Sequence, residues 1–293
     1  MVTKPTWQQR VFQVFNTLFM VFMVVIAFYP MWHVLCASLS NASEYIAHRG
    51  LLLLPLKPTL AAYENAFQHP LILGAYGNTL FIVATGTVMS TILSAIAAYF
   101  ISRKRVMLGR PITLFMVFTM YFSGGLIPFY FVVKGLGLSN SLWVLILPTM
   151  ISVFNVMVMR AGFSAIPDSV EESARIDGAG HIIILFRIMI PLALPTIAVI
   201  VLYYAVNYWN SWFYASIFIK DRTKYPLQLV LRQILLKNDT REMSFGVDSG
   251  DKMAIGETIK YAVCMIATLP VLCFYPFVQK YFIKGVMIGA VKG

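Results

Sequence analysis

Charged side chains are scarce in this sequence. Asp, Glu, Lys and Arg make up 12% of the 293 residues, whereas a soluble domain usually carries about 25%. Hydrophobic residues make up 59%, and the mean hydropathy is +0.76. None of the four charged residue types occurs in six stretches: 11–43, 70–102, 111–133, 135–159, 188–219 and 261–279. Because about 20 apolar residues are enough to cross a bilayer, the sequence predicts an integral membrane protein.

These stretches lack the ionisable groups that several classes of membrane protein need. A carrier driven by an ion gradient usually has a carboxylate or a basic group within its spans. A channel usually has a ring of charges or a filter-like loop. Neither pattern occurs here. This absence argues against ion coupling, but backbone carbonyls could still bind sodium, so an ion-coupled sugar carrier stays as an alternative.

Residues for catalysis, nucleotide hydrolysis and metal binding are also missing. The sequence has no G-x-x-x-x-G-K-[ST] phosphate loop. Its three cysteines (Cys36, Cys264 and Cys273) form no C-x-x-C pair, and Ser123 and Ser164 lack the nucleophile-elbow pattern. We therefore expect no catalytic site, no metal site and no cofactor bound by this chain. The alternative is a membrane-embedded enzyme that modifies glycans or lipids.

Positive charge exceeds negative charge, with 23 Lys and Arg against 12 Asp and Glu and a net charge of +11. In a membrane protein we expect this excess to set the topology and to contact lipid head groups, not nucleic acid. The short basic loop 103–110 is expected to be cytoplasmic. An even number of spans then places both termini in the cytoplasm. Loop 220–260 would lie outside despite eight basic residues, among which six carboxylates are interspersed.

The expected fold is all-α, because none of the apolar stretches alternates polar and apolar residues as the strands of a membrane barrel do. We expect one transmembrane domain, 1–293, with a cytoplasmic loop, 164–190, between the fourth and fifth of six helices. The six spans are expected at about 11–39, 71–102, 111–133, 141–163, 191–219 and 260–282.

Loop 164–190 holds four of the twelve carboxylates. Pro167 is followed by overlapping D-x-x-E and S-x-x-E patterns, which predict the start of a helix. Asp177-Gly178 predicts its end, because glycine readily takes the left-handed conformation there. A second short helix is expected at about 181–190. An apolar strip beside the acids is typical of a helix that lies in a partner's groove; a solvated helical loop is the alternative.

The spacing in this loop resembles the E-A-A, G, I-x-L-P motif of bacterial ABC importer permeases. The matching residues are Glu172-Ser173-Ala174, Gly178 and Ile188-x-Ile190-Pro191. Serine replaces the middle alanine, and isoleucine replaces leucine. These are mild departures from the motif.

The resemblance extends over nearly the whole chain. The C-terminal residues 284–293 are similar to those of permeases in maltose-type sugar importers. Residues 120–128 and 135–138 are similar to the polysaccharide subgroup of that family. Within the subgroup, length and pattern are similar to the second permease of bacterial alginate importers, although permeases for rhamnogalacturonan fragments share these features.

The resemblance implies the type I ABC importer permease fold, in a multi-pass protein of the bacterial cytoplasmic (inner) membrane. It implies a transport subunit whose partners are a second homologous permease, two ATP-binding subunits that hold ATP and Mg, and an extracytoplasmic solute-binding protein. The cargo implied is an oligo- or polysaccharide, with an alginate-like polyuronide preferred. The C-terminal tail would also reach toward the ATPase pair. The residues implied for contact with the ATPase are Glu171, Glu172, Ser173, Ala174, Asp177, Gly178 and Ala179.

Residues 203–214 are rich in aromatic and amide side chains, which stack on sugar rings and hydrogen-bond to hydroxyls. The Trp209-Asn210 pair also resembles a fifth-span motif of sugar importer permeases. The alternative is an aromatic belt with hydrogen bonds between helices. The candidate substrate-pathway residues are Asn155, Tyr204, Asn207, Tyr208, Trp209, Asn210 and Trp212. For Asn155 we favour a helix contact.

The basic side chains of the expected outer loop are further candidates for contact with cargo or with a binding protein. A solvated loop is the alternative, because acids are interspersed. These residues are Lys220, Arg222, Lys224, Arg232, Lys237, Arg241 and Lys252.

Overall fold

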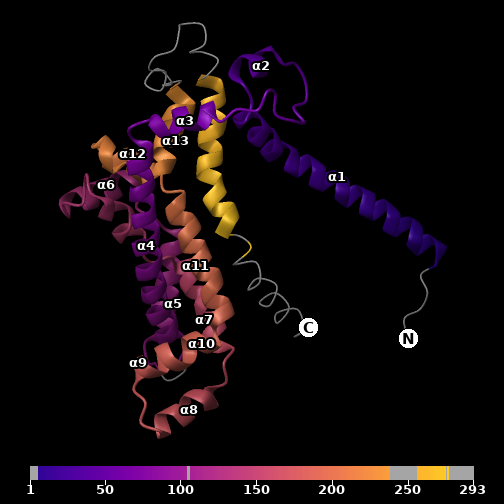
Figure 1. Cartoon of the computed structure of the whole chain (residues 1–293). Helices are drawn as coiled ribbons and strands as arrows, with labels where there is room; N and C mark the ends of the chain where they lie inside the picture. The colour runs from indigo at the N-terminus through magenta and orange to yellow at the C-terminus, as the bar shows by residue number, and fades with distance from the viewer. Residues whose placement is uncertain (1–5, 104–105, 238–255, 275, 277–293) are drawn as a thin grey trace. The chain divides into compact units, whose positions relative to one another are not determined.

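The computed structural model describes residues 6–103, 106–237, 256–274 and 276. Every regular element in these ranges is helical, as the sequence predicts (Figure 1). The described residues of Met1–His69 and Gln233–Thr268 form one compact unit, and those of Pro70–Arg232 and Leu269–Gly293 form a second. The end of the predicted sixth span and the tail 284–293 lie outside the described residues.

The first unit contains α1 (Trp7–Ser38), α2 (Ala42–Ala47), α3 (Ala61–Gln68) and most of the helix Gly256–Phe274. A capping box begins α1: the Thr6 hydroxyl accepts from the backbone N–H of Gln9, and the Gln9 side chain accepts from the backbone N–H of Thr6. Only the last turn of α1 is buried.

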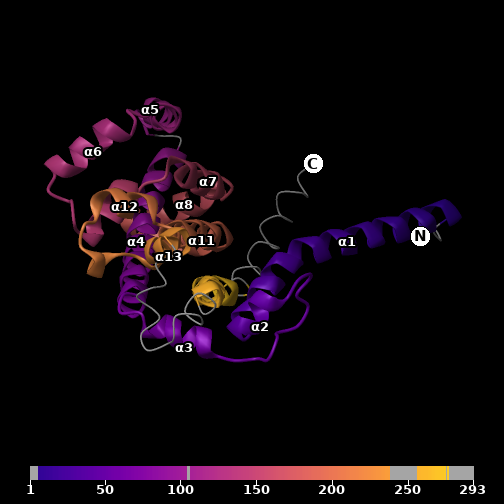
Figure 2. The ribbon, with the colours of Figure 1, turned by 90° about the horizontal axis from the view of Figure 1, so that it is seen from above.

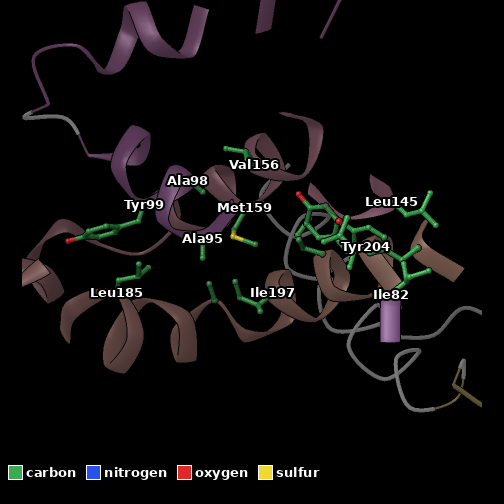
Figure 3. Packing of buried hydrophobic residues seen from close by; sticks show 14 of the residues in the cluster. Ile82, Ala95, Ala98, Tyr99, Leu145, Val156, Met159, Leu185, Ile197 and Tyr204 are labelled. Carbon is green, nitrogen blue, oxygen red and sulfur yellow. The ribbon is translucent and has the colours of Figure 1, made fainter. Parts of the chain in front are cut away.

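The second unit is built around α4 (Ile72–Ser102), against which α7 (Val153–Ser164) and α11 (Leu194–Trp209) pack (Figure 2). Apolar side chains from these three helices fill the core, including Ala95, Met159 and Ile197 (Figure 3). The remaining elements are α5 (Gly109–Tyr121), α6 (Leu126–Gly135), η1 (Leu142–Leu145), η2 (Leu147–Thr149), α8 (Asp168–Ile176), α9 (His181–Ile183), η3 (Ile184–Met189), α10 (Ile190–Leu192), α12 (Phe213–Phe218), η4 (Arg222–Lys224) and α13 (Leu227–Lys237), which crosses into the first unit after Arg232.

Small residues let α11 approach α4 closely. Gly86, Ser90 and Ser94 follow one another at intervals of four along one face of α4. A Cβ atom on Gly86 would lie 2.8 Å from the ring of Tyr208 on α11. Small residues at a helix contact are common in membrane proteins, because they let two helices approach closely. Such close packing matters there because the hydrophobic effect does little to hold helices together in lipid.

Among the described residues, three helices are long and apolar enough to span a membrane without a break: Trp7–Ser38, Ile72–Ser102 and Gly256–Phe274. Three pairs of helices with a sharp bend between them are broken spans or re-entrant loops, and the number of spans is six if each pair is one span. The bends are 113° between Gly109–Tyr121 and Leu126–Gly135, 50° between Leu142–Thr149 and Val153–Ser164, and 90° between His181–Leu192 and Leu194–Phe218.

Glycine explains the sharpest of these bends. Gly125 has a φ of 85°, a conformation that side chains with a Cβ rarely adopt. The charge-free run 111–133 is therefore two helices, α5 and α6, and not one straight helix.

Candidate functional site

Helix α8 begins and ends where the sequence predicts. Pro167 occupies the N-cap position with a φ of −57°, which suits a residue that lacks an N–H. Asp168 and Glu171 place negative charge in the first turn, near the positive end of the helix dipole. The predicted capping box does not form, because the N-cap residue is Pro167 and the N-cap makes no side-chain hydrogen bond.

A Schellman motif closes the other end of α8. The N–H of Gly178 donates to the carbonyl of Arg175 at 3.0 Å, and the N–H of Ala179 donates to the carbonyl of Ala174 at 2.9 Å. Gly178 has a φ of 79°, which favours glycine. Three of the residues singled out from the sequence (Ala174, Gly178 and Ala179) therefore fix the shape of this turn.

We expect Gly178→Ala to lower the stability of the α8 turn by about 1–2 kcal/mol, because alanine is strained in the left-handed conformation. A lower melting temperature of the purified transporter would show it. Gly180→Ala is the matched control, since Gly180 has an ordinary φ of −74° and its Cβ would meet no atom within 4 Å. An equal effect of both variants would contradict this explanation.

A buried carboxylate holds α8 on the core. Glu171 is 5% exposed. Its Oε2 accepts from Arg103 Nη1 at 2.6 Å, and its Oε1 accepts from Arg175 Nη2 at 2.6 Å and from the Tyr99 hydroxyl at 3.2 Å. Arg103 also donates to the backbone carbonyl of Phe163 at 3.2 Å. The group of Glu171, Arg103, Arg175 and Tyr99, which we call the Glu171 clamp, thus joins α8 to the ends of α4 and α7.

The two arginines keep Glu171 ionised. Burial by itself would raise the pKa of this carboxyl, but the hydrogen bonds and charges of Arg175 and Arg103 outweigh burial and lower the pKa. The ion pair with Arg103 is shielded, since the two side chains are 11% and 7% exposed. Removing one partner of such a buried pair usually costs about 3–5 kcal/mol, because it leaves an uncompensated charge.

The other face of α8 is exposed. Glu172, Ser173, Asp177 and Gly178 lie on the surface, and the Ile176 side chain is 86% exposed. Of the residues expected to meet an ATPase, Glu171 and Ala174 point inward instead, and contact by the others stays a prediction. The i, i+4 pair of Glu171 and Arg175 could have been found from sequence spacing, but Tyr99 and Arg103 could not.

Tyr204 and Tyr208, two of the candidate pathway residues, connect helices within the chain. The Tyr204 hydroxyl lies 2.7 Å from the Ser94 hydroxyl and accepts from the N–H of Ser152 at 3.0 Å. The Tyr208 hydroxyl lies 2.8 Å from that of Ser90. Asn155 and Trp209 are buried as well. These four residues therefore lie among the helices of the second unit.

Asn207, Asn210 and Tyr203 lie on the exposed face of α11 and its C-terminal end. Their spacing of four and then three residues places them on one side of the helix. Asn210 donates to the carbonyl of Val206 at 2.9 Å and accepts from the side chain of Gln228 at 3.3 Å. The sequence singled out both asparagines but not Tyr203. We call these three residues the α11 stripe.

Comparison with known proteins places this arrangement in a family. A family model described as binding-protein-dependent transport system inner membrane component matches residues 90–288. The chain belongs to this family. Among its relatives in Bacillus subtilis (strain 168), the polygalacturonan/rhamnogalacturonan transport system permease protein YtcP is 40% identical over 291 residues, which are 98% of this chain and 100% of the relative. Protein LplC of the same organism is 40% identical over 289 residues, or 97% of this chain and 96% of the relative.

A solved structure supports the same assignment. The crystal structure of a bacterial ABC transporter involved in the import of the acidic polysaccharide alginate contains a chain that is 30% identical to this permease. The match has a TM-score of 0.87 and covers 96% of this chain and 100% of the other. The ABC importer permease fold expected from the sequence is thereby confirmed.

Membership of this family also shows what the chain does in broad terms. This permease is a transport subunit of the inner membrane and not an enzyme. As in ABC importers generally, a partner permease, an ATPase and a binding protein complete the assembly.

Proposed function

We propose that this permease carries an acidic oligo- or polysaccharide, a polyuronide such as alginate or polygalacturonan, into the cell by alternating access. It pairs with a second homologous permease, two ATP-hydrolysing subunits and an extracytoplasmic binding protein. Both termini and α8 face the cytoplasm. The named cargo of YtcP and of the alginate importer supports this class of substrate.

The Glu171 clamp is the observation that carries this mechanism. A helix that receives force from an ATPase must be fixed to the spans that move, and α8 is fixed to α4 and α7 through one buried carboxylate. Along α4, Ser94 and Ser90 then connect to Tyr204 and Tyr208 of α11. Movement of α8 would therefore be passed to α11, on whose exposed face the α11 stripe offers an aromatic ring and amides to sugar.

The proposal is tested with the complete transporter in proteoliposomes, supplied with its binding protein and either oligogalacturonate or oligoalginate. We expect uptake of unchanged cargo that requires ATP, with ATPase activity stimulated by the loaded binding protein. Uptake without ATP would indicate an ion-coupled carrier. Cleavage or transfer of the glycan by this chain alone would indicate an enzyme.

Glu172→Lys tests the exposed face of α8 separately. We expect it to lower stimulated ATPase activity and uptake at least about tenfold, because reversing a charge in a protein contact costs on the order of 1.4 kcal/mol or more. The melting temperature of the permease should change much less than in variants of the clamp. Full retention of uptake would show that this face makes no contact with the ATPase.

A further inference from the structure

The C-terminal end of α11 is remote from α8 (Figure 1). Four polar and aromatic side chains meet there. Asn210 and Trp212 come from the corner between α11 and α12, and Gln228 and Arg232 from α13. The guanidinium carbon of Arg232 lies 3.7 Å from the centroid of the Trp212 ring. Gln228 donates to Asn210 at 3.3 Å, and it lies on the same side of α13 as Arg232, four residues before it. We call these four residues the Arg232 cluster.

Stacking fixes the plane of the Arg232 guanidinium while leaving its N–H groups free. The contact with Trp212 uses the flat face of the group, whereas the hydrogen-bond donors lie along its edge. Within the described residues, Arg232 forms no ion pair with a carboxylate. The result is an exposed, oriented cation whose donors match the geometry of a carboxylate, which arginine binds through two parallel hydrogen bonds.

The surroundings favour an anionic sugar. Residues 220–232 contain four basic side chains and one acidic, a net charge of +3. Asn210 and Gln228 use only some of their hydrogen-bonding capacity on each other and on Val206, which leaves donors and acceptors for hydroxyl groups. The α11 stripe also ends at Asn210, so the cluster is continuous with the candidate pathway.

We propose that the Arg232 cluster is a uronate subsite at the outer mouth of the pathway. Arg232 binds the carboxylate of one sugar residue, Asn210 and Gln228 bind its hydroxyls, and Trp212 is a positioning residue that orients the guanidinium. This inference rests on the proposed function and adds to it the residue that distinguishes acidic from neutral sugar units.

The test compares two cargoes in the complete transporter: oligogalacturonate with free carboxylates, and a partially methyl-esterified oligomer to which the binding protein binds equally well. We expect Arg232→Gln to lower uptake of the free acid about ten- to hundredfold, the range for hydrogen bonds between charged groups. Uptake of the ester should fall far less. Arg232→Lys should give an intermediate loss, because lysine keeps the charge but not the planar fork.

Arg222→Gln is the matched control. Arg222 is exposed and lies in the same basic segment, so this variant removes the same charge without touching the cluster. The inference is overturned if Arg222→Gln lowers uptake of the free acid as much as Arg232→Gln does. It is also overturned if Arg232→Gln affects both cargoes equally or neither. If the unmodified transporter takes up neither cargo in the presence of ATP, the proposed function itself fails.

Discussion

Glu171→Ala is expected to destabilise the permease by about 3–5 kcal/mol, since it leaves the buried guanidinium of Arg103 without its carboxylate. The same change frees α8 from α4 and α7. We therefore expect the stimulated ATPase activity and the uptake to be lost together with thermal stability. The measurements are the melting temperature of the purified transporter and coupled uptake in proteoliposomes.

A double-mutant cycle with Arg103→Ala shows whether the loss comes from this pair. Removing both partners should cost less than the sum of the single changes, because no unpaired charge stays behind. For the melting temperature alone, the adjacent Glu172→Gln variant serves as the control, since Glu172 lies on the exposed face of α8. A melting temperature unchanged by Glu171→Ala would refute the stabilising role of the clamp.

The lowered pKa of Glu171 also predicts how the clamp responds to pH. A carboxyl with a lower pKa in the folded state stabilises the protein above its unfolded pKa of about 4.3. That stabilisation is lost as the pH falls through the folded pKa. We expect Glu171→Gln to remove this acid-sensitive contribution, while the clamp of the unmodified permease stays intact at neutral pH.

The second large effect is expected for Gly86→Leu. The leucine side chain would occupy the space of the Tyr208 ring, which a Cβ on Gly86 would already approach to 2.8 Å. Overpacking usually costs about 1–3 kcal/mol, and we expect a loss of about 3 kcal/mol because the Tyr208 hydroxyl is also bound to Ser90. Thermal unfolding of the purified transporter measures the loss.

Gly77→Leu is the matched control on the same helix, because a Cβ on Gly77 would meet no atom within 4 Å. A smaller side chain at position 208, as in Tyr208→Leu, should recover part of the stability lost by Gly86→Leu. If Gly77→Leu and Gly86→Leu destabilise the permease equally, contact between α4 and α11 does not explain the effect.

Local signals in the sequence predict α8 well. Pro167 and Asp177-Gly178 act on the backbone of their immediate neighbours, so the start and the end of the helix can be predicted without the rest of the fold. The all-α architecture is equally predictable, because it follows from the length of the charge-free runs.

Orientation of side chains is less predictable, because it depends on distant partners. Glu171 and Glu172 are adjacent in sequence, yet only Glu171 turns toward Arg103, which lies 68 residues earlier in the chain. Tyr208 and Asn207 are also neighbours, and contact with α4 decides which of them is buried. The bend at Gly125 is likewise hidden within an unbroken apolar run.

The Glu171 clamp also constrains how this permease can evolve. Replacement of Glu171 alone leaves the buried cation of Arg103 unpaired, and replacement of Arg103 alone leaves the buried anion of Glu171 without this partner. A permease that carries only one of the two replacements is therefore less stable than one that carries neither. Adjacent Glu172 lies on the exposed face of α8, so its replacement leaves no buried charge behind. We therefore expect the two consecutive glutamates to tolerate replacement differently: Glu171 can change only together with its buried partner, whereas a change of Glu172 leaves no charge in the core.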